Sequence, residues 1–308
     1  MAGRNDDRDT CGEIRDDVRT DIREFLTTRR ARISPEQAGL PIYGGARRRV
    51  SGLRREEVAL LAGISTEYYT RLERGNATGM SEGVIGGIAH ALQLDEAERT
   101  HLLDLLRAAG TSRRPPRRRL TRQRVRPTVQ RVLDSMSGTP AFVLNGRLDV
   151  LTANALGYAL FAPIYADPVR PPNNARFVFL DPHAGEFFRD WDTVANDTVA
   201  LLRAEVGRDP YDRQLSDLIG ELSTRSDDFR GRWAAHNVRI HTTGIKLLHH
   251  PVVGDLDLPF ESFPLASDPS QSLLTYTAEP GSPSQDALNL LASWTATTNV
   301  EQPASTSD

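Results

Sequence analysis

Side chains that can hydrogen-bond to nucleic acid are concentrated between residues 65 and 74 of this chain. The stretch reads STEYYTRLER and contributes seven candidates: Ser65, Thr66, Glu67, Tyr68, Thr70, Arg71 and Arg74. A glutamate can accept a hydrogen bond from a cytosine amino group, and a threonine can contact a thymine methyl group. Arginines contact phosphates. Tyr68 is expected to contact the nucleic-acid backbone or to lie flat on the protein surface.

Two short helices would hold these side chains in place, and residues 53–75 have the pattern for both. The first helix has an apolar face at helical spacing, made by Val58, Leu61 and Ala62. Gly63 tolerates the left-handed backbone of a sharp turn, and Ser65 can cap the helix that follows. That helix has two inward apolar residues, Tyr69 and Leu72, and Gly75 ends it.

This arrangement is typical of a helix-turn-helix, whose second helix enters the DNA major groove. Thr66 and Glu67 would then meet base edges, with Thr70 one turn further on. Arg71 and Arg74 would contact phosphates. The alternative is an αα-hairpin with no nucleic-acid role, in which Glu67 only favours the helix dipole and the arginines aid solubility.

Positive charge is concentrated in the same part of the chain. Residues 1–126 hold 25 arginines against 18 acidic residues, a balance of +7, whereas the remainder holds 13 basic and 23 acidic residues, a balance of −10. A basic front half favours a polyanion as partner. Arg47, Arg48 and Arg49 precede the motif, where they would hold phosphates or reach into a minor groove. The alternative for these three arginines is a solvated charge run, and Arg55 is also placed for a phosphate.

Longer motifs resemble a known family. VALLAGISTEYYTRLERG resembles the helix-turn-helix of the Cro/C1 (XRE) class of bacterial and phage regulators. GLP at 39–41, RRR at 47–49, GLRREEVALLAGIS at 52–65 and YYTRLERG at 68–75 together resemble the MmyB-like regulators. FRGRWAAHNV, HHPVVGDLDL and LLTYTAEPGS look like the same family, so the resemblance covers about residues 20–294. It implies a DNA-binding domain joined to a C-terminal PAS-like domain that binds a fatty acid.

Bulk composition fits two folded domains in a reducing compartment. The chain has 308 residues, 39% of them hydrophobic, and a single cysteine, Cys11. One cysteine excludes a disulfide framework and a cysteine-based metal cluster. No apolar run approaches the roughly 20 residues of a membrane helix, and the N-terminus lacks the apolar region of a secretion signal. We therefore expect a cytoplasmic protein with no membrane partner.

The expected fold is multidomain, with an all-α five-helix helix-turn-helix domain followed by an α+β PAS-like domain. The expected segments are a disordered tail at 1–17, the helical domain at 18–110, an Arg/Pro-rich linker at 111–126, the PAS-like domain at 127–296 and a disordered tail at 297–308. In the helical domain we expect the first helix at 18–33 and the fourth at 81–92. Asp95 and Glu98 form an acidic capping box at the fifth. The first residue of the second helix stays open, because Gly52, Leu53 and Arg54 stand where a capping Ser or Thr is usual.

The start of the second domain has a strand, turn, strand, helix pattern. Phe142–Leu144 and Leu148–Thr152 are expected to be strands, and Asn145-Gly146 between them is a strong hairpin signal. A helix is expected from Asn154 to about Phe161. This order is how a PAS-like domain begins. Further along we expect a long helix after Trp191, a helix at 211–222, strands within 238–250, 254–265 and 272–278, and a last helix at 284–294.

A fatty-acid pocket needs apolar walls and a polar anchor for the carboxylate. The candidates for its walls are Phe142, Leu144, Leu160, Phe161, Trp191, Trp233 and Val238. The candidates for its anchor are Asn154, Arg203, His236 and Arg239. The alternative for each is an ordinary core or surface residue.

Nothing in the second domain indicates catalysis. The spacing of His236, His241, His249 and His250 fits no metal signature, and the chain has no GxSxG elbow, phosphate-binding glycine loop or Rossmann fingerprint. We therefore predict no enzyme activity, no cofactor and no metal.

The predicted function is sequence-specific binding of double-stranded DNA by a homodimeric transcription regulator that senses a small, fatty-acid-like ligand. A dimer is expected because one short recognition helix reads too few base pairs. Two alternatives remain open: a C-terminal domain that serves only dimerisation or protein interaction, and an enzyme that acts on the bound small molecule.

Overall fold

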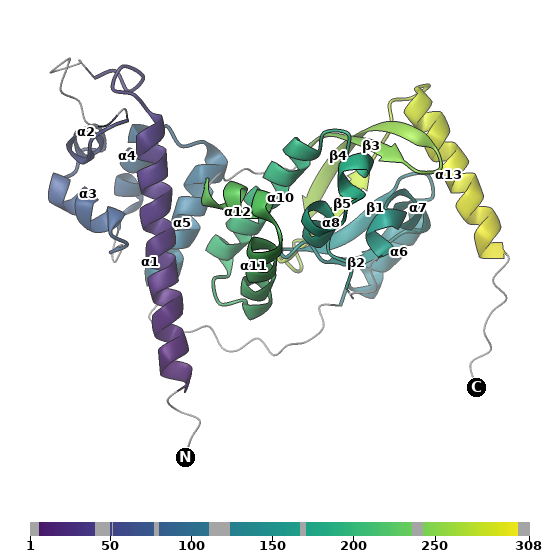
Figure 1. Cartoon of the computed structure of the whole chain (residues 1–308), viewed down its shortest axis with the longest axis horizontal. Coiled ribbons are helices and arrows are strands. Elements are labelled where there is room, and N and C mark those ends of the chain that lie inside the picture. Colours follow the sequence, from purple (N-terminus) through teal and green to yellow (C-terminus); the bar gives the residue numbers. More distant parts are fainter. Residues whose placement is uncertain are drawn as a thin grey trace. The chain divides into compact units, whose positions relative to one another are not determined.

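The computed structural model describes residues 6–40, 50, 52–76, 80–110, 124–166, 171–235 and 243–300, with side chains from Val18 to Trp294 (Figure 1). It divides into two compact units. The first comprises residues 1–118 with 203–213 and 232–239, and the second comprises residues 119–202, 214–231 and 240–308. No helix in the described ranges is both long and apolar enough to cross a bilayer.

Five helices make up the N-terminal part of the first unit (Figure 1): α1 Asp6–Arg32, α2 Arg55–Leu61, α3 Thr66–Glu73, α4 Glu82–Ala91 and α5 Glu96–Gly110. The expected five-helix domain is confirmed. One boundary differs, because α1 begins at Asp6 and takes in residues 6–17, which we expected to be a disordered tail. Extending an existing helix adds one hydrogen bond per ordered residue, so a polar segment can continue a helix that an apolar segment nucleates.

The core of these five helices forms where the apolar periodicity predicts it. From α1 it takes Ile22, Phe25 and Leu26, which are fully buried. Tyr69 and Leu72 of α3 are buried against it, as the helix-turn-helix pattern requires. The side chains of α3 that could contact a partner therefore share the opposite, exposed face.

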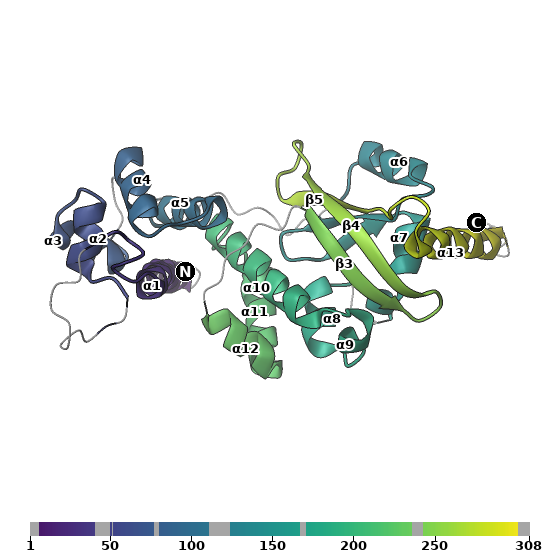
Figure 2. The same cartoon turned by 90° about the horizontal axis from the view of Figure 1, so that it is seen from above.

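A five-stranded antiparallel sheet is the centre of the second unit (Figure 2). Its strands are β1 Ala141–Asn145, β2 Val150–Ala153, β3 Thr243–His250, β4 Gly254–Pro264 and β5 Gln271–Tyr276. Their spatial order is β2-β1-β5-β4-β3. The hairpin β1–β2 followed by helix α7 Ala155–Leu160 confirms the predicted PAS-like start.

The other helical elements of the second domain are α6 Pro127–Ser135, the 3₁₀ helix η2 Ala162–Tyr165, α8 Asn174–Leu180, α9 Ala184–Phe187, α10 Trp191–Arg208, α11 Arg213–Arg225, α12 Asp227–Ala234 and α13 Pro283–Val300. Sequence analysis predicted no element at α12. The last helix is also longer than expected and continues through residues 295–300.

The two faces of the sheet are covered differently. Aromatic rings pack on the inner face, where Phe161 lies 5.1 Å from Phe142 and 5.2 Å from Tyr276 between ring centroids. On the outer face, Leu133 of α6 packs against Ala141 and Val143 of β1. Strands β3 and β4 alternate accordingly, with every second residue turned to the inner face.

Candidate nucleic-acid interface and ligand site

The exposed face of α3 carries most of the predicted DNA contacts. Ser65 caps the helix by accepting a hydrogen bond from the backbone N–H of Tyr68 at 3.1 Å. The exposed candidates are Ser65, Thr66, Glu67, Arg71 and Arg74, and Thr70 is half-buried. These side chains project from one short helix, as a surface that reads a groove requires.

The predicted turn geometry before α3 is confirmed. Gly63 has φ +66°, and Ile64 N–H donates to Ala59 O at 3.0 Å across the turn. At the other end of α3, Gly75 has φ +81°, and a Cβ there would lie 2.6 Å from the Cβ of Arg19. Glycine is therefore required at Gly75 both by the backbone conformation and by the close approach of α1.

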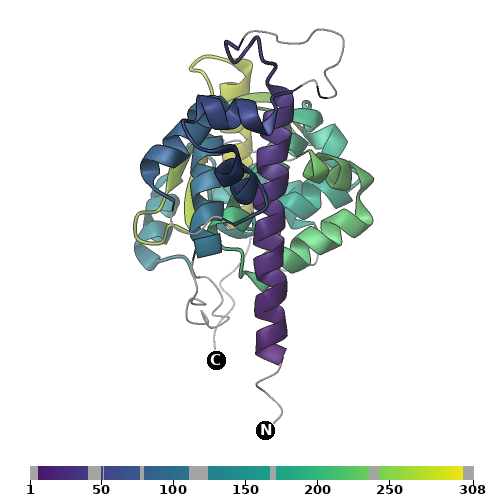
Figure 3. The same cartoon turned by 90° about the vertical axis from the view of Figure 1, so that its left-hand side faces the viewer.

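A buried carboxylate fixes α3 to α1 and α2, which lie beside it (Figure 3). Glu73 is only 2% exposed and accepts hydrogen bonds from Arg30 Nε at 2.9 Å and Thr27 Oγ1 at 3.2 Å. It also forms an ion pair with Arg55. One buried carboxylate therefore joins three helices.

Arg55 consequently has a structural role that the phosphate prediction did not include. Its Nε bonds to Glu73, while 53% of its side chain remains exposed. Arg30, the second partner of Glu73, was missed, because α1 and α3 are far apart in sequence. The local signal was the group of three arginines, Arg29, Arg30 and Arg32, in the last turn of α1.

Tyr68 also has a defined position. The guanidinium of Arg71 lies over its ring, 5.2 Å from the centroid. A cation above an aromatic face is attracted by the ring quadrupole. Tyr68 therefore restricts where the Arg71 charge can lie on the surface of α3.

The open question about the start of α2 is settled. Arg54 is the N-cap residue, and its backbone N–H donates to the Glu57 carboxylate at 2.6 Å. Glu57, the third residue of the helix, therefore satisfies the backbone N–H of the N-cap residue, and no Ser or Thr is needed there. Arg47, Arg48 and Arg49, predicted at phosphates, lie outside the described residues.

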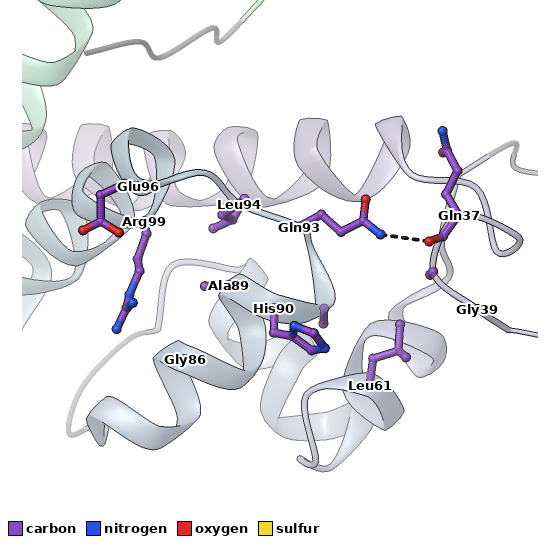
Figure 4. Close-up of a pocket in the computed structure, with 12 residues that line it drawn as sticks. Gln37, Gly39, Leu61, Gly86, Ala89, His90, Gln93, Leu94, Glu96 and Arg99 are labelled. Carbon is purple, nitrogen blue, oxygen red and sulfur yellow. Dashed lines mark hydrogen bonds between the residues drawn. The ribbon is translucent and has the colours of Figure 1, made fainter. Parts of the chain in front are cut away.

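A pocket of about 680 Å³ lies on the first unit, between α4, the end of α2 and the loop after α1 (Figure 4). Its lining includes Gly39, Leu61, Gly86 and His90. Gln93 bridges one side by donating from Nε2 to Gln37 O at 2.9 Å. None of the predicted ligand residues that the structure describes lines this pocket.

In the second unit, several predicted wall residues pack against one another. Phe142 and Phe161 are buried in the aromatic cluster with Leu160, and Leu144 packs against the same cluster. Trp191 is half-buried, and its Nε1 donates to Val178 O at 2.9 Å. These residues form the inner face of the domain, as expected for walls and equally for a core.

Asn154 is a structural residue instead of the predicted anchor. Its Oδ1 accepts from Gly157 N at 2.7 Å and from Ala141 N at 3.1 Å. Its Nδ2 donates to Met136 O and Thr139 O, both at 2.7 Å. An amide has two donor hydrogens and one acceptor oxygen with two lone pairs, so no capacity is left for a ligand.

Arg203 and Trp233 also differ from the prediction. The Arg203 guanidinium donates to Trp233 O and lies 4.1 Å from the centroid of the Trp233 ring. Burial lowers the pKa of Arg203 to about 10. Both residues belong to the first compact unit, whereas Phe142 and Phe161 belong to the second. His236, Val238 and Arg239 lie outside the described residues.

The HHPVVG motif forms a structural turn. His250 is buried, its Nε2 pairs with Ala159 O at 3.1 Å, and its Nδ1 accepts from Val252 N at 3.2 Å. The neighbouring His249 points outward and pairs with Asp255 at 2.6 Å. Among the described residues, no group of three or more His, Cys, Asp or Glu could hold a metal ion.

Sequence analysis overlooked the half-buried charge of Lys246. It is the sole lysine of the chain and lies on the inner side of β3. Its Nζ is 3.9 Å from Asp197 Oδ2 of α10 and 5.2 Å from the Phe260 ring centroid. Strand alternation could have found it, because Lys246 occupies an inward position between Gly244 and Leu248.

Comparisons with known families agree with this geometry. A profile described as the MmyB-like transcription regulator ligand binding domain matches residues 125–291, which is more than half of the chain. A profile described as a helix-turn-helix domain matches residues 24–102. A search of curated proteins found no match.

Proposed function

The chain belongs to the MmyB-like transcription regulators, and we propose that it binds a specific DNA operator as a homodimer under the control of a fatty-acid-like ligand. Members of this family are DNA-binding regulators with a ligand-binding domain. The operator specificity, the dimer, the ligand class and a cytoplasmic location are our proposals.

The observation that carries the DNA proposal is the exposed face of α3. Glu67 and Thr66 lie at the N-terminal end of this helix, where helix-turn-helix residues meet base edges. Arg71 lies one turn on, with its charge held over Tyr68. Buried Glu73 holds α3 in position through ion pairs with Arg30 of α1 and Arg55 of α2.

The test is a binding titration on an operator selected from random duplexes. We expect Arg71→Ala to weaken binding to all sequences alike and to reduce the salt slope by about 1. Glu67→Ala should instead relax the preference at one base pair, by about 1–3 kcal/mol. If both variants bound every duplex like the wild type, the proposed recognition surface would be wrong.

The ligand proposal rests on the family profile and on the apolar inner face of the sheet. A ligand changes operator affinity only if it binds the DNA-competent and DNA-incompetent arrangements with different affinity. Native mass spectrometry followed by denaturing extraction tests for a bound molecule. A released lipid of one chain-length class is the expected result.

One observation favours a second function for the C-terminal domain. Phe142 and Phe161, predicted as pocket walls, are buried against each other. A filled core of this kind suits a domain that only dimerises or contacts another protein. A purified dimer that neither carries a lipid nor binds an added one would favour this alternative.

A further inference from the structure

The last helix of the second unit, α13, turns two large apolar side chains to solvent. Leu290 is 62% exposed and Trp294 is 53% exposed. They are four residues apart, so they lie one turn from each other on the same face of the helix. Another face of α13 belongs to the core, where Leu288 and Leu291 are buried. The helix therefore has an apolar face inside the domain and a second apolar face at the surface.

The exposed face of α13 also lacks charge. Residues 287–300 contain no Asp, Glu, Lys or Arg, although 26% of the chain is charged. A helix that borders water ordinarily has charged or polar residues on its outer face, whereas the centres of protein interfaces are depleted in charge and enriched in tryptophan. Helix α13 is the outermost element at its end of the second unit (Figures 1 and 2). Its composition is thus that of a contact surface.

The polar groups beside this face have hydrogen bonds within the helix. Ser293 Oγ donates to Asn289 O at 2.9 Å, and Gln285 Nε2 donates to Asn289 Oδ1 at 3.0 Å. Burial of a polar group is costly unless the group is hydrogen-bonded. A partner that covers Leu290 and Trp294 therefore leaves these hydrogen bonds in place.

The charge of the domain favours a second copy of this chain as that partner. Residues 127–308 hold 13 basic and 23 acidic residues, a balance of −10, so two copies repel each other over most of this surface. A twofold interface brings the same patch of both copies together, and a charged patch would face like charge. The uncharged residues 287–300 avoid this repulsion. A basic partner, in contrast, would gain no attraction from a helix segment without acidic residues.

We propose that α13 is the dimerisation surface of this chain and pairs antiparallel with α13 of a second copy. The twofold axis passes near Trp294, so the Trp294 rings of the two copies contact each other, and Leu290 packs on the C-terminal part of the opposite helix. Antiparallel helices also have their dipoles in opposite directions, which is the favourable orientation. The inference rests on the homodimer that is part of the proposed function.

Sedimentation velocity of the full-length protein over a dilution series tests the assignment. Trp294→Glu should raise the dissociation constant of the dimer at least tenfold, because two carboxylates would face each other across the axis. Ile245→Glu is the matched control, since it adds the same charge at another exposed apolar residue of the domain, on β3, and should leave the constant unchanged. Both positions are exposed, so both variants should keep the circular dichroism of the wild type.

A charge exchange at Trp294 tests the antiparallel register. Trp294→Lys alone should weaken the dimer as Trp294→Glu does, because like charges again face each other. An equimolar mixture of the two variants should associate at least tenfold more tightly than either variant alone, because opposite charges then meet. A mixture that associates no better than its components would show that the two Trp294 side chains do not meet across the axis.

The outcomes distinguish this interface from the homodimer itself. If the wild type is a dimer and Trp294→Glu dimerises equally well, the assignment of α13 is wrong while the homodimer stands. If Ile245→Glu dissociates the dimer and Trp294→Glu does not, the interface lies on the sheet instead. If the wild type is monomeric at every concentration, the homodimer in the proposed function fails, and the pairing of α13 fails with it.

Discussion

A single buried carboxylate, Glu73, ties together three helices of the DNA-binding domain. It is the last residue of α3, and its partners Arg30 and Arg55 come from α1 and α2. The position of the recognition helix thus depends on a residue that does not face DNA. Burial therefore separates the side chains of α3 that can contact DNA from those that hold the helix in position.

We expect Glu73→Gln to lower the free energy of unfolding by about 3 kcal/mol, because it removes the charge of the buried carboxylate that pairs with Arg30 and Arg55. Chemical denaturation followed by circular dichroism measures the change. Glu67→Gln on the exposed side of the same helix is the control and should stay within about 0.5 kcal/mol. A loss below about 1 kcal/mol for Glu73→Gln would contradict the role assigned to this carboxylate.

His250 gives the second domain a pH-dependent contribution to stability. Burial lowers its pKa below the ordinary value of 6.5, and its Nδ1 already accepts from Val252 N. The unfolded chain therefore binds more protons than the folded chain once the pH falls below about 6.5. We expect the contribution to be present at neutral pH and to be lost as the pH falls.

Unfolding titrations between pH 7.5 and pH 5 test the His250 prediction. His250→Asn should reduce the slope of stability against pH, whereas His249→Asn, on the exposed side of the same strand, should retain it. An unchanged slope in His250→Asn would show that other groups cause the dependence.

Helix α4 has two adjacent glycines, of which one is needed for close packing and the other is not. At Gly87 a Cβ would lie 2.6 Å from the carbonyl oxygen of Ala62, so glycine lets α4 approach α2. At Gly86 a Cβ would meet nothing within 4 Å, and this glycine lines the pocket. Only the first position has a packing reason for glycine.

We expect Gly86→Ala to raise the free energy of unfolding by about 1 kcal/mol, because alanine is the better helix former. Gly87→Ala should lower it by about 2 kcal/mol, because the backbone of α2 cannot move away without cost. Thermal unfolding of the two variants side by side provides the comparison. Equal shifts of the same sign would mean that the approach of α4 to α2 is not a tight constraint.

Elements were predictable to the extent that their signals are local. The capping box of α5 is confirmed, with Glu98 N–H donating to Asp95 at 2.8 Å and Asp95 N–H donating to Glu98 at 3.2 Å. The α12 helix was missed, because its apolar pattern is short and its buried residue Phe229 packs against Phe179 from a distant segment. Contacts between segments far apart in the chain produce no periodic pattern in the sequence.

For the whole molecule, the proposed regulation is a coupling between two binding events. If dodecanoic acid changes operator affinity by some factor, the operator must change the affinity for dodecanoic acid by the same factor. We expect a factor of about 10, within the usual range for such coupling. Fluorescence anisotropy measures the first quantity and calorimetry the second.

A duplex of scrambled sequence and equal length is the control for this coupling and should leave the affinity for the acid unchanged. If the acid binds and operator affinity does not respond, the ligand is a structural component of the domain. The sensing part of the proposal would then be wrong, while DNA binding would stand.

The sequence by itself determined the features that depend on neighbours along the chain. Helical periodicity placed Tyr69 and Leu72 inside, the turn needed Gly63, and Asn145-Gly146 marked the hairpin that opens the second domain. These signals arise from backbone conformation and from the spacing of side chains on one element. Together they identified the helix-turn-helix and the start of the PAS-like sheet.

Only the tertiary structure decided which polar side chains make hydrogen bonds and ion pairs within the protein. Asn154 uses all of its hydrogen bonds within the fold, Arg55 pairs with Glu73, and Lys246 lies beside Asp197. In each case the deciding partner comes from another element. The physical reason is that burial and long-range hydrogen bonding depend on how helices and strands pack, and residue type and local spacing do not encode that packing directly.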